Sequence, residues 1–240
     1  MFIIPMAGKS SRFFNAGYKI PKYMLPLGQD SCVFVEAIKS FELYFSSDFF
    51  LFIIRDEDGI EEFVKSKCSY LGINKYEIIS LNYDTRGQAD TVSIGLEKSK
   101  HANLNEEIYV FNIDSIRLHF KKPESNFLNN IGGYLEVFKG EGEHWSFAEP
   151  LNDNLVSRTT EKIRISNLCS NGLYYFRSAQ FFIKSFTELE KVNNYKELFI
   201  APMYNLLIEE QIIVKYVLVD INDTLFSGTP KEYEILLNQF

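Results

Sequence analysis

The first half of the chain alternates short apolar runs with segments whose apolar residues recur at helical spacing. The apolar runs are Phe2 to Met6, Phe49 to Ile54, Tyr76 to Leu81 and Ile108 to Asn112. The helical patterns between them are Phe34/Ile38/Phe41, Ile60/Phe63/Val64 and Ala89/Val92/Leu96. Strands that alternate with helices build βαβ units around a parallel sheet. Because the runs are almost continuously apolar, we expect helices to cover both faces of that sheet.

From Gly132 onward the strands become shorter and more alternating, which predicts a second, mixed lobe continuous with the first. The candidate strands are Gly133 to Phe138, His144 to Glu149, Leu173 to Phe176 and Ile212 to Asp220, and the candidate helices lie near Ala179 to Glu190 and Glu197 to Glu209. Thr229 to Glu232 reads Thr-Pro-Lys-Glu, a capping box with proline at the first helical position. This motif predicts a final helix.

The composition limits the partners and the compartment. The 240 residues carry 25 basic and 32 acidic side chains, a net charge of −7, which argues against nonspecific binding to long nucleic acid. No apolar run approaches the roughly 18 residues of a membrane span, and the amino terminus has no basic segment typical of a secretory signal. Cys32, Cys68 and Cys169 are odd in number and far apart, so they indicate buried thiols of a reducing compartment. We therefore expect a cytoplasmic protein without a membrane partner.

Two cationic segments follow the first strand. Residues 6–13 read Met-Ala-Gly-Lys-Ser-Ser-Arg-Phe, a small polar loop that can bring backbone amides close to a phosphate at the carboxyl edge of a parallel sheet. It is not a Walker loop, because no second glycine followed by Lys-Ser/Thr is present. Residues 20–27 place Lys22 between two prolines, which stiffens the backbone that carries the ammonium group. Ordinary solvated surface loops are the alternative for both segments.

Taken together, the two segments resemble the signature of the sugar-phosphate nucleotidyltransferases, in which small-Ala-Gly-x-Gly-Ser/Thr-Arg precedes Pro-Lys and an apolar Leu-Pro. The resemblance extends over nearly the whole chain. Further matching blocks are Gly87-Gln88-Ala89, Asn112-Ile113-Asp114, Trp145 to Glu149, Glu161-Lys162, Asn171 to Phe176, Ala201 to Asn205 and Gly228-Thr229-Pro230.

This resemblance implies a three-layer α/β/α fold around a mostly parallel Rossmann-like sheet, the nucleotide-diphospho-sugar transferase or glycosyltransferase A-like type. Residues 1–240 would form one domain, with the nucleotide over about 1–130 and the acceptor over about 131–240. The implied reaction is the transfer of a nucleoside monophosphate from a nucleoside triphosphate to a sugar 1-phosphate or similar acceptor, with Mg²⁺ as cofactor and release of pyrophosphate. The subgroup suggests capsule or surface-polysaccharide synthesis. The resemblance leaves open whether the protein forms a homo-oligomer.

The same resemblance assigns roles to individual residues. Arg12 and Lys22 would stabilise the triphosphate and the leaving pyrophosphate, and Asp114 would bind magnesium. An aspartate directly after a buried strand lies at the edge where open α/β sheets bind ligands, which favours this role on its own. The nucleotide-binding residues would be Ala7, Gly8, Lys9, Ser10, Ser11 and Gln88, and the acceptor-binding residues Glu161, Lys162 and Gly172.

Several of these residues have a plainer interpretation. Asp114 could be a helix N-cap, and Gln88 could complete a capping box with Thr85. Trp145, the only tryptophan, is expected in the core rather than as a stacking platform. Arg164 lies two residues after Lys162 and is a second candidate cation for the acceptor phosphate. The histidines His101, His119 and His144 have no spacing typical of a metal site.

The chain departs from the family pattern at two positions. Ser10 replaces a glycine that allows close approach to the nucleotide. Phe226 replaces an aspartate that the family uses as a second metal ligand, and the nearby Asp220 and Asp223 are candidate substitutes.

Three other functions compete with this prediction. One is a cytidylyltransferase that activates a non-sugar phosphate, such as a choline-like capsule decoration. The second is a glycosyltransferase of related fold, which would carry Asp-x-Asp where residues 112–114 read Asn-Ile-Asp. The third is a non-catalytic protein that binds a nucleotide sugar, an option that Phe226 keeps open.

Overall fold

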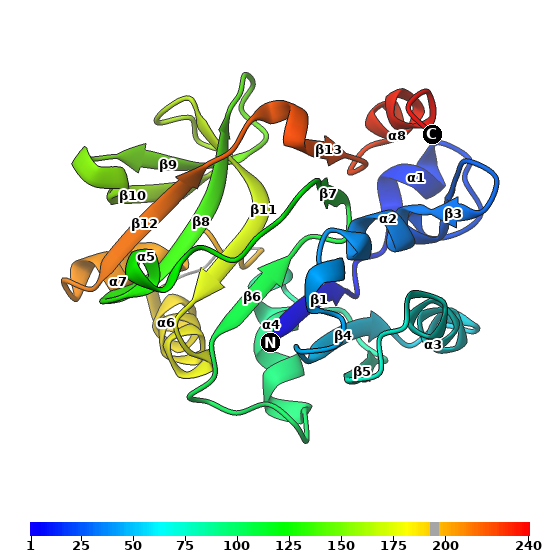
Figure 1. Ribbon diagram of the computed structural model, residues 1–240, viewed down its shortest axis with the longest axis horizontal. Coiled ribbons are helices and arrows are strands. Elements are labelled where there is room, and N and C mark those ends of the chain that lie inside the picture. Colours follow the sequence, from blue (N-terminus) through cyan, green and yellow to red (C-terminus); the bar gives the residue numbers. More distant parts are fainter. Residues whose placement is uncertain (193–196) are drawn as a thin grey trace.

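The strands predicted in the first half form the parallel part of one large sheet (Figure 1). The protein is represented by a computed structural model, which describes residues 1–192 and 197–240. The strands here are β1 (Phe2–Met6), β4 (Phe50–Arg55), β5 (Tyr76–Leu81) and β6 (Ile108–Phe111), in the order β6-β1-β4-β5 and parallel throughout. The connecting helices are α2 (Val33–Lys39), α3 (Ile60–Leu71) and α4 (Gln88–Lys98). The predicted βαβ alternation is confirmed.

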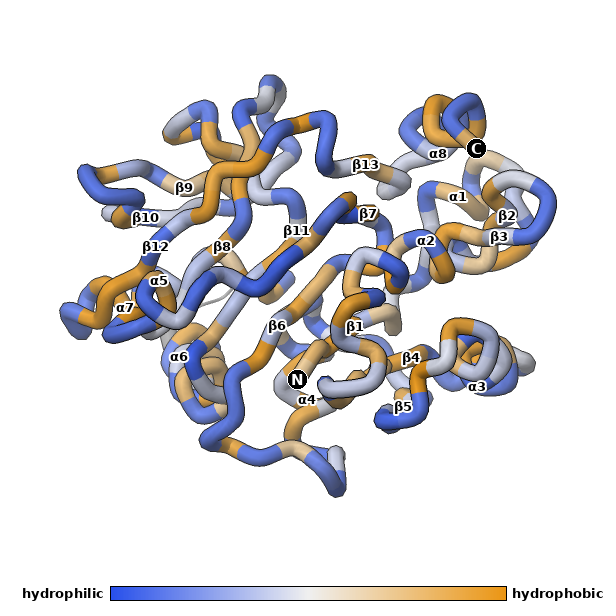
Figure 2. The backbone as a smooth tube through the Cα atoms, in the orientation of Figure 1, coloured by the Kyte–Doolittle hydropathy of each residue, from blue (hydrophilic) through white to orange (hydrophobic). Residues whose placement is uncertain are grey.

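Residues that alternate along each parallel strand point into two different cores. Phe2 and Phe52 pack with α2 and α3 on one face, whereas Ile3 and Ile53 pack with α4 on the other. Side chains of consecutive strand residues point to opposite faces of a sheet, so a strand between two helical layers must be apolar at every position. The predicted three-layer arrangement is therefore confirmed, and Figure 2 shows the hydrophobic strands at its centre.

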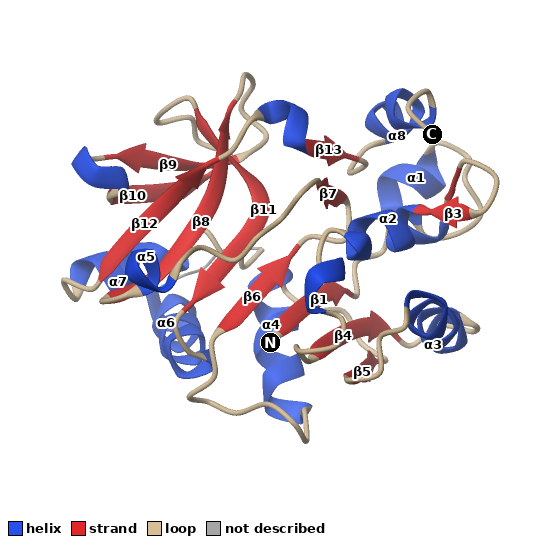
Figure 3. Ribbon diagram, viewed as in Figure 1, coloured by secondary structure: helices blue, strands red, loops and turns tan. Residues whose placement is uncertain are grey.

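Antiparallel pairing joins the second half to the same sheet. Its strands are β8 (Ile131–Lys139), β9 (Ser146–Pro150), β10 (Val156–Glu161), β11 (Leu168–Phe176) and β12 (Ile213–Leu218). Strand β11 pairs with β6, β8 and β9, so it connects the parallel half to the mixed lobe (Figure 3). The sequence analysis did not predict β10.

The helices of the second half follow the predictions with one correction. Helix α6 spans Ala179–Val192 and packs on the same face as α4. The helix expected from Glu197 begins only at Met203 and ends at Glu209 as α7. Pro202 disfavours a helical conformation in the residue before it, and the backbone of Leu198 is hydrogen-bonded elsewhere. The final helix α8 (Pro230–Leu237) begins with the predicted capping box.

Two short antiparallel strand pairs and two short α-helices complete the strands and α-helices of the described residues. They are β2 (Pro26–Leu27) with β3 (Ser31–Cys32), β7 (Ser115–Arg117) with β13 (Thr224–Phe226), α1 (Ser11–Asn15) and α5 (Ser125–Leu128). All three cysteines are free and buried, as predicted. No helix in residues 1–192 and 197–240 combines the length and the apolar character needed to cross a membrane.

A buried polar network attaches the antiparallel β7–β13 strand pair to the main sheet. Arg117 on β7 donates from Nε to Glu136 Oε2 on β8 over 2.7 Å, and Asn171 on β11 donates to the same oxygen over 2.8 Å. Thr224 on β13 lies 3.4 Å from the Asn171 amide. A buried ion pair of this kind is costly to break but specifies one arrangement. The network therefore fixes the strand pair beside the site described next.

Candidate active site

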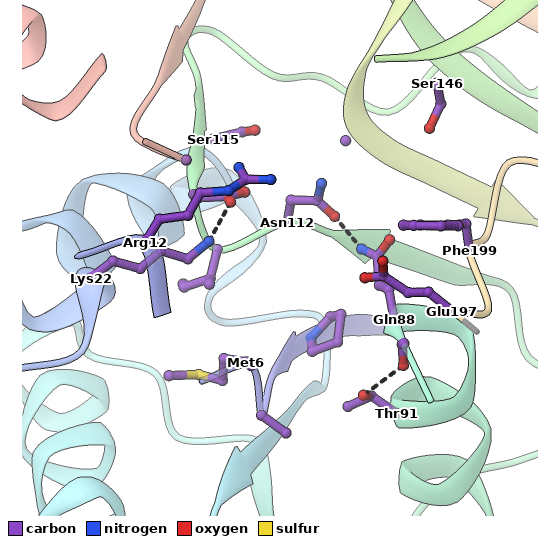
Figure 4. A pocket seen from close by; sticks show the side chains of 18 of the residues that line it. Met6, Arg12, Lys22, Gln88, Thr91, Asn112, Ser115, Ser146, Glu197 and Phe199 are labelled. Atoms are coloured by element: carbon purple, nitrogen blue, oxygen red, sulfur yellow. Dashed lines mark hydrogen bonds and ion pairs between the residues drawn. The ribbon is translucent and has the colours of Figure 1, made fainter. Parts of the chain in front are cut away.

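A cavity of about 760 Å³ opens at the carboxyl ends of the parallel strands. Open α/β sheets bind ligands at this edge. Of the residues predicted for the site, those that line the cavity are Ala7, Gly8, Lys9, Ser11, Arg12, Lys22, Gln88, Asp114, Glu161, Lys162 and Gly172. Ser10 lies behind the lining. In Figure 4, Arg12 and Lys22 lie on one side of the cavity, Glu197 and Phe199 lie on the other, and Asn112 and Gln88 lie between them.

The two residues predicted to act on phosphate and metal lie together. Lys22 donates from Nζ to Asp114 Oδ2 although 92 residues separate them in the sequence. Burial by itself would raise the pKa of the Asp114 carboxyl, but the Lys22 ammonium and the charge of Arg12 outweigh it, so the pKa lies below its usual value. Asp114 precedes β7 and caps no helix, which excludes that alternative. It is a carboxylate that stays ionised.

The loop between β1 and the first helix is tied to the Lys22 segment through Ser10. Its backbone is left-handed, with φ 51° and ψ 27°, and its Oγ accepts a hydrogen bond from the Lys22 backbone N–H over 3.2 Å. A left-handed conformation is one that glycine adopts at least cost, which explains why the family pattern has glycine here. The loop is also shorter than the predicted residues 6–13, because residues from Ser11 onward, including Arg12, form α1.

Two further charged residues line the cavity near Lys9 and were not predicted. Arg55 ends β4, and Asp84 follows β5. Asp84 accepts ion pairs from Lys9 at 2.5 Å and from Arg55 at 2.8 Å. Arg55 lies at the carboxyl end of a parallel strand, and the rule that favours Asp114 would have identified it too.

Gln88 interacts with the strand edge and not with a helix cap. Its Nε2 donates to Asn112 Oδ1, the residue directly after β6. The suggested capping box with Thr85 does not form, because the N-cap residue of α4 is Gly87 and the Thr85 hydroxyl pairs with that of Thr91 at 2.7 Å.

Gly172 makes room for Asn112. It has φ +93°, and a Cβ at this position would lie within 2.7 to 2.9 Å of three Asn112 side-chain atoms. The register of β11 shifts between Ser170 and Tyr174, which places this glycine in an irregular part of the strand. Because the Gly172 carbonyl also accepts the Asn112 N–H over 3.1 Å, this glycine positions Asn112 at the floor of the cavity.

The residues predicted to bind the acceptor combine one cation with two carboxylates on one side of the cavity. Lys162 Nζ lies 3.7 Å from Glu161 Oε1, 3.8 Å from Glu197 Oε2 and 4.2 Å from the centre of the Phe199 ring. Burial raises the pKa of the Glu161 carboxyl, although the hydrogen bond from Ser146 and the charge of Lys162 oppose the shift. The sequence missed Glu197 and Phe199 because a helix was expected there.

Residues 197–200 connect the two sides of the cavity. Leu198 donates its backbone N–H to the Arg86 carbonyl over 2.6 Å, and its own carbonyl accepts from the Ala89 N–H over 3.0 Å. Its neighbours Glu197 and Phe199 both reach Lys162. One short segment therefore links the start of α4 to Lys162.

The structure separates the two candidate cations for the acceptor. Strand β10 ends at Glu161, and Lys162 has φ 55°, so Lys162 and Arg164 do not share a strand face. Arg164 donates to the Gly142 and Gly140 carbonyls over 2.9 and 3.0 Å and does not line the cavity.

Trp145 is not the core residue that was expected. It is only half-buried and lines the cavity together with Phe226, whose ring centre lies 4.8 Å away. Phe226 pairs with Ser115, the residue after Asp114, so it does occupy the position beside the predicted metal ligand. The suggested substitutes Asp220 and Asp223 do not line the cavity.

The donors beside Asp114 can be tested for magnesium. Within residues 1–192 and 197–240, no group of three or more His, Cys, Asp or Glu side chains is placed to hold a metal ion. Magnesium usually takes one or two carboxylates and completes its shell with water and substrate phosphates. A Cβ on Gly228 would lie 3.2 Å from Asp114 Oδ2, so the glycine leaves a gap beside this oxygen. An ionised carboxylate with such a gap, next to the cations Lys22 and Arg12, has the chemistry of one magnesium ligand.

The fold, with a cavity lined by cations at the edge of its parallel strands, is that of a nucleotidyltransferase. No protein-family model and no curated protein sequence matches the chain. Among solved structures, it resembles a nucleoside-diphosphate-sugar pyrophosphorylase from Vibrio cholerae RC9, at 41% identity over 100% of both chains with a TM-score of 0.94. The chain therefore belongs to the sugar-phosphate nucleotidyltransferase family.

More distant structures share the fold alone. A putative glucose-1-phosphate thymidylyltransferase from Bacillus anthracis is 16% identical over 99% of this chain and 94% of its own, with a TM-score of 0.76. A CTP:phosphocholine cytidylyltransferase from Streptococcus pneumoniae is 15% identical over 99% and 97%, with a TM-score of 0.74.

Proposed function

We propose that this nucleotidyltransferase transfers a nucleoside monophosphate from a nucleoside triphosphate to a small phosphorylated acceptor, a sugar 1-phosphate in the first instance, and releases pyrophosphate. The observation that carries the proposal is one cavity with Arg12 and Lys22 at Asp114 on one side and Lys162 on the other. Two anionic substrates repel each other, so each needs its own cationic position if they are to approach within one cavity. We further propose that the enzyme is cytoplasmic and acts in surface-polysaccharide synthesis. Its three free cysteines are consistent with the cytoplasm, where thiols are kept reduced.

In the proposed reaction, an oxygen of the acceptor phosphate attacks the α-phosphorus. The bond from that phosphorus to the bridging oxygen breaks, and pyrophosphate leaves with the electron pair. Arg12 and Lys22 would neutralise the charge that develops on the leaving group, while Lys162 would orient the attacking phosphate. Asp114 would hold magnesium, which supplies additional positive charge to the phosphate oxygens when bound. No nucleophilic side chain is required.

A second candidate is a cytidylyltransferase that acts on a cationic, choline-like phosphate. The observation in its favour is the pair of half-buried aromatic rings, Trp145 and Phe226, on the same cavity as the Glu161 carboxylate. Aromatic faces attract quaternary ammonium groups.

The two candidates are separated by a substrate panel. CTP, UTP, ATP, GTP and dTTP are each combined with several sugar 1-phosphates and with phosphocholine, and pyrophosphate release is measured. The main proposal expects one nucleotide and one sugar 1-phosphate to react far faster than the other pairs, whereas fast release with phosphocholine supports the second. Absence of pyrophosphate from every pair, together with binding of a nucleotide sugar, would indicate a non-catalytic protein.

Lys162→Ala is expected to raise the KM for the acceptor at least tenfold while the KM for the nucleotide changes by about twofold or less, because only the acceptor side loses a cation. Steady-state kinetics with each substrate varied in turn measure this. Arg158→Ala is the matched control, since Arg158 is an exposed cation on β10, the strand directly before Lys162, and pairs with Glu149 outside the cavity. Equal effects of Lys162→Ala on both KM values would remove Lys162 from acceptor binding.

A further inference from the structure

The aromatic residue at position 226 leaves Asp114 without the second carboxylate that the family resemblance implies. The Phe226 ring packs against Trp145 at 4.8 Å and Phe138 at 5.4 Å between ring centres, so its place is apolar. The carboxylate of Asp220 accepts from the backbone and side-chain amides of Asn222, both over 2.9 Å, and Asp220 does not line the cavity. A carboxylate for this role must come from another element.

Glu232 supplies a carboxylate at this place. It lies in the first turn of α8 and lines the cavity. A Cβ built on Gly228 would lie 3.4 Å from Glu232 Oε2 and 3.2 Å from Asp114 Oδ2. The two oxygens therefore border one common space, and this space exists because residue 228 has no side chain.

Hydrogen bonds hold both carboxylates in position. Ser227 donates its backbone N–H to the Asp114 carbonyl over 2.8 Å, which fixes the neighbouring Gly228 beside Asp114. The Thr229 N–H donates to Glu232 Oε2 over 2.8 Å, as part of the capping box that starts α8. A carboxylate oxygen can accept more than one hydrogen bond or ligand bond, so Glu232 can cap the helix and still bind a cation.

The chemistry of this pair matches a small divalent cation. Two carboxylate oxygens that border one space repel each other, and a cation bound in that space would offset the repulsion. Lys22 pairs with the Asp114 oxygen of this space and supplies part of that positive charge. Magnesium prefers one or two carboxylates together with phosphate oxygens, and Arg12 and Lys22 mark where phosphates would bind. We infer that Glu232 is the second carboxylate ligand of a magnesium ion held with Asp114, an assignment that rests on the proposed function.

The test measures metal binding directly, with Mn²⁺ as the probe and electron paramagnetic resonance to detect the free ion. The wild type is expected to bind Mn²⁺, and Glu232→Gln should weaken the affinity about tenfold or more, because loss of even an outer-shell partner of a metal ligand commonly costs that much and Glu232 would bind the ion directly. Glutamine also serves in a capping box, so the variant keeps α8 and should unfold at the same temperature as the wild type without metal. Glu232→Asp, which retains the charge, should recover part of the affinity.

Glu234→Gln provides the matched control, because Glu234 is an exposed carboxylate two residues further along the same helix. It should bind Mn²⁺ like the wild type. Equal affinities of the wild type and Glu232→Gln, or no Mn²⁺ binding by the wild type, would overturn the inference. Pyrophosphate release by the wild type is measured separately on the substrate panel, so failure of the Glu232 assignment is distinguishable from failure of the proposed function.

Discussion

Lys22→Ala is expected to lower kcat for pyrophosphate release about a hundredfold or more, as removal of a preorganised charge at a developing anion commonly does. Lys22 is the cation that reaches Asp114, and Arg12 lines the same side of the cavity. The charge on the leaving pyrophosphate grows in the transition state, so its stabilisation affects kcat more than ground-state binding. Arg12→Ala should show a similar loss.

The kinetic experiment varies the nucleotide and the acceptor separately. Lys19→Ala is the matched control, because Lys19 is an exposed lysine of the same segment outside the cavity lining. Lys22→Arg should restore part of the activity, since it keeps the charge. A change in KM alone, with kcat preserved, would mean that Lys22 binds the ground state and the transition state equally.

Arg117→Met is expected to reduce the free energy of unfolding by about 3 to 5 kcal/mol, because it leaves the carboxylate of Glu136 buried without a cation. Arg117 is 8% exposed and Glu136 is 2% exposed, so water cannot replace the lost partner. The loss should also lower activity, since Arg117 lies on β7, the strand that begins directly after Asp114. Urea unfolding monitored by circular dichroism measures the change.

The pH dependence of this variant follows from Glu136. Burial raises the pKa of its carboxyl even with Arg117 present, and loss of the cation raises it further. The folded state then binds a proton that the unfolded state has released, so stability falls as the pH rises above the unfolded value near 4.3. The deficit relative to the wild type should therefore be smaller at pH 5 than at pH 7.

A double variant provides the control. Arg117→Met with Glu136→Gln removes both charges while the new amide oxygen can still accept from Asn171, so most of the lost stability should return. If the double variant is as unstable as Arg117→Met alone, the defect comes from lost packing and not from an unpaired charge.

The amino-acid sequence alone was sufficient for elements whose signal is local. The apolar run Phe2 to Met6 and the run Tyr76 to Leu81 became strands with the predicted bounds, and the Thr229 to Glu232 capping box starts α8 as expected. Periodicity and capping depend on residues within a few positions of one another, so they can be recognised without the rest of the chain. The motifs at residues 6–13 and 20–27 indicated the family for a similar reason, because each is a short run of consecutive residues.

Local patterns failed where distant segments decide the conformation. The expected helix from Glu197 is replaced at its start by an irregular segment, because Leu198 hydrogen-bonds to Arg86 and Ala89, which lie more than 100 positions earlier. Trp145 was expected in the core, but only the fold places it at a cavity wall beside Phe226.

The candidate site shows the same division. Its residue types could be predicted, because Arg12, Lys22 and Asp114 follow strands and loops that are recognisable in the sequence. Their mutual geometry could not: Lys22 meets Asp114 across 92 positions, and Glu232 approaches the same carboxylate from the last helix. The order of strands in the sheet and the buried network that holds the β7–β13 strand pair determine these contacts. The sequence alone indicated site candidates whose signal is a local motif, such as Arg12, Lys22 and Asp114. The tertiary structure added Arg55, Glu197 and Glu232 to the cavity and decided which side chains touch, because such contacts arise only when the sheet brings distant strand ends together.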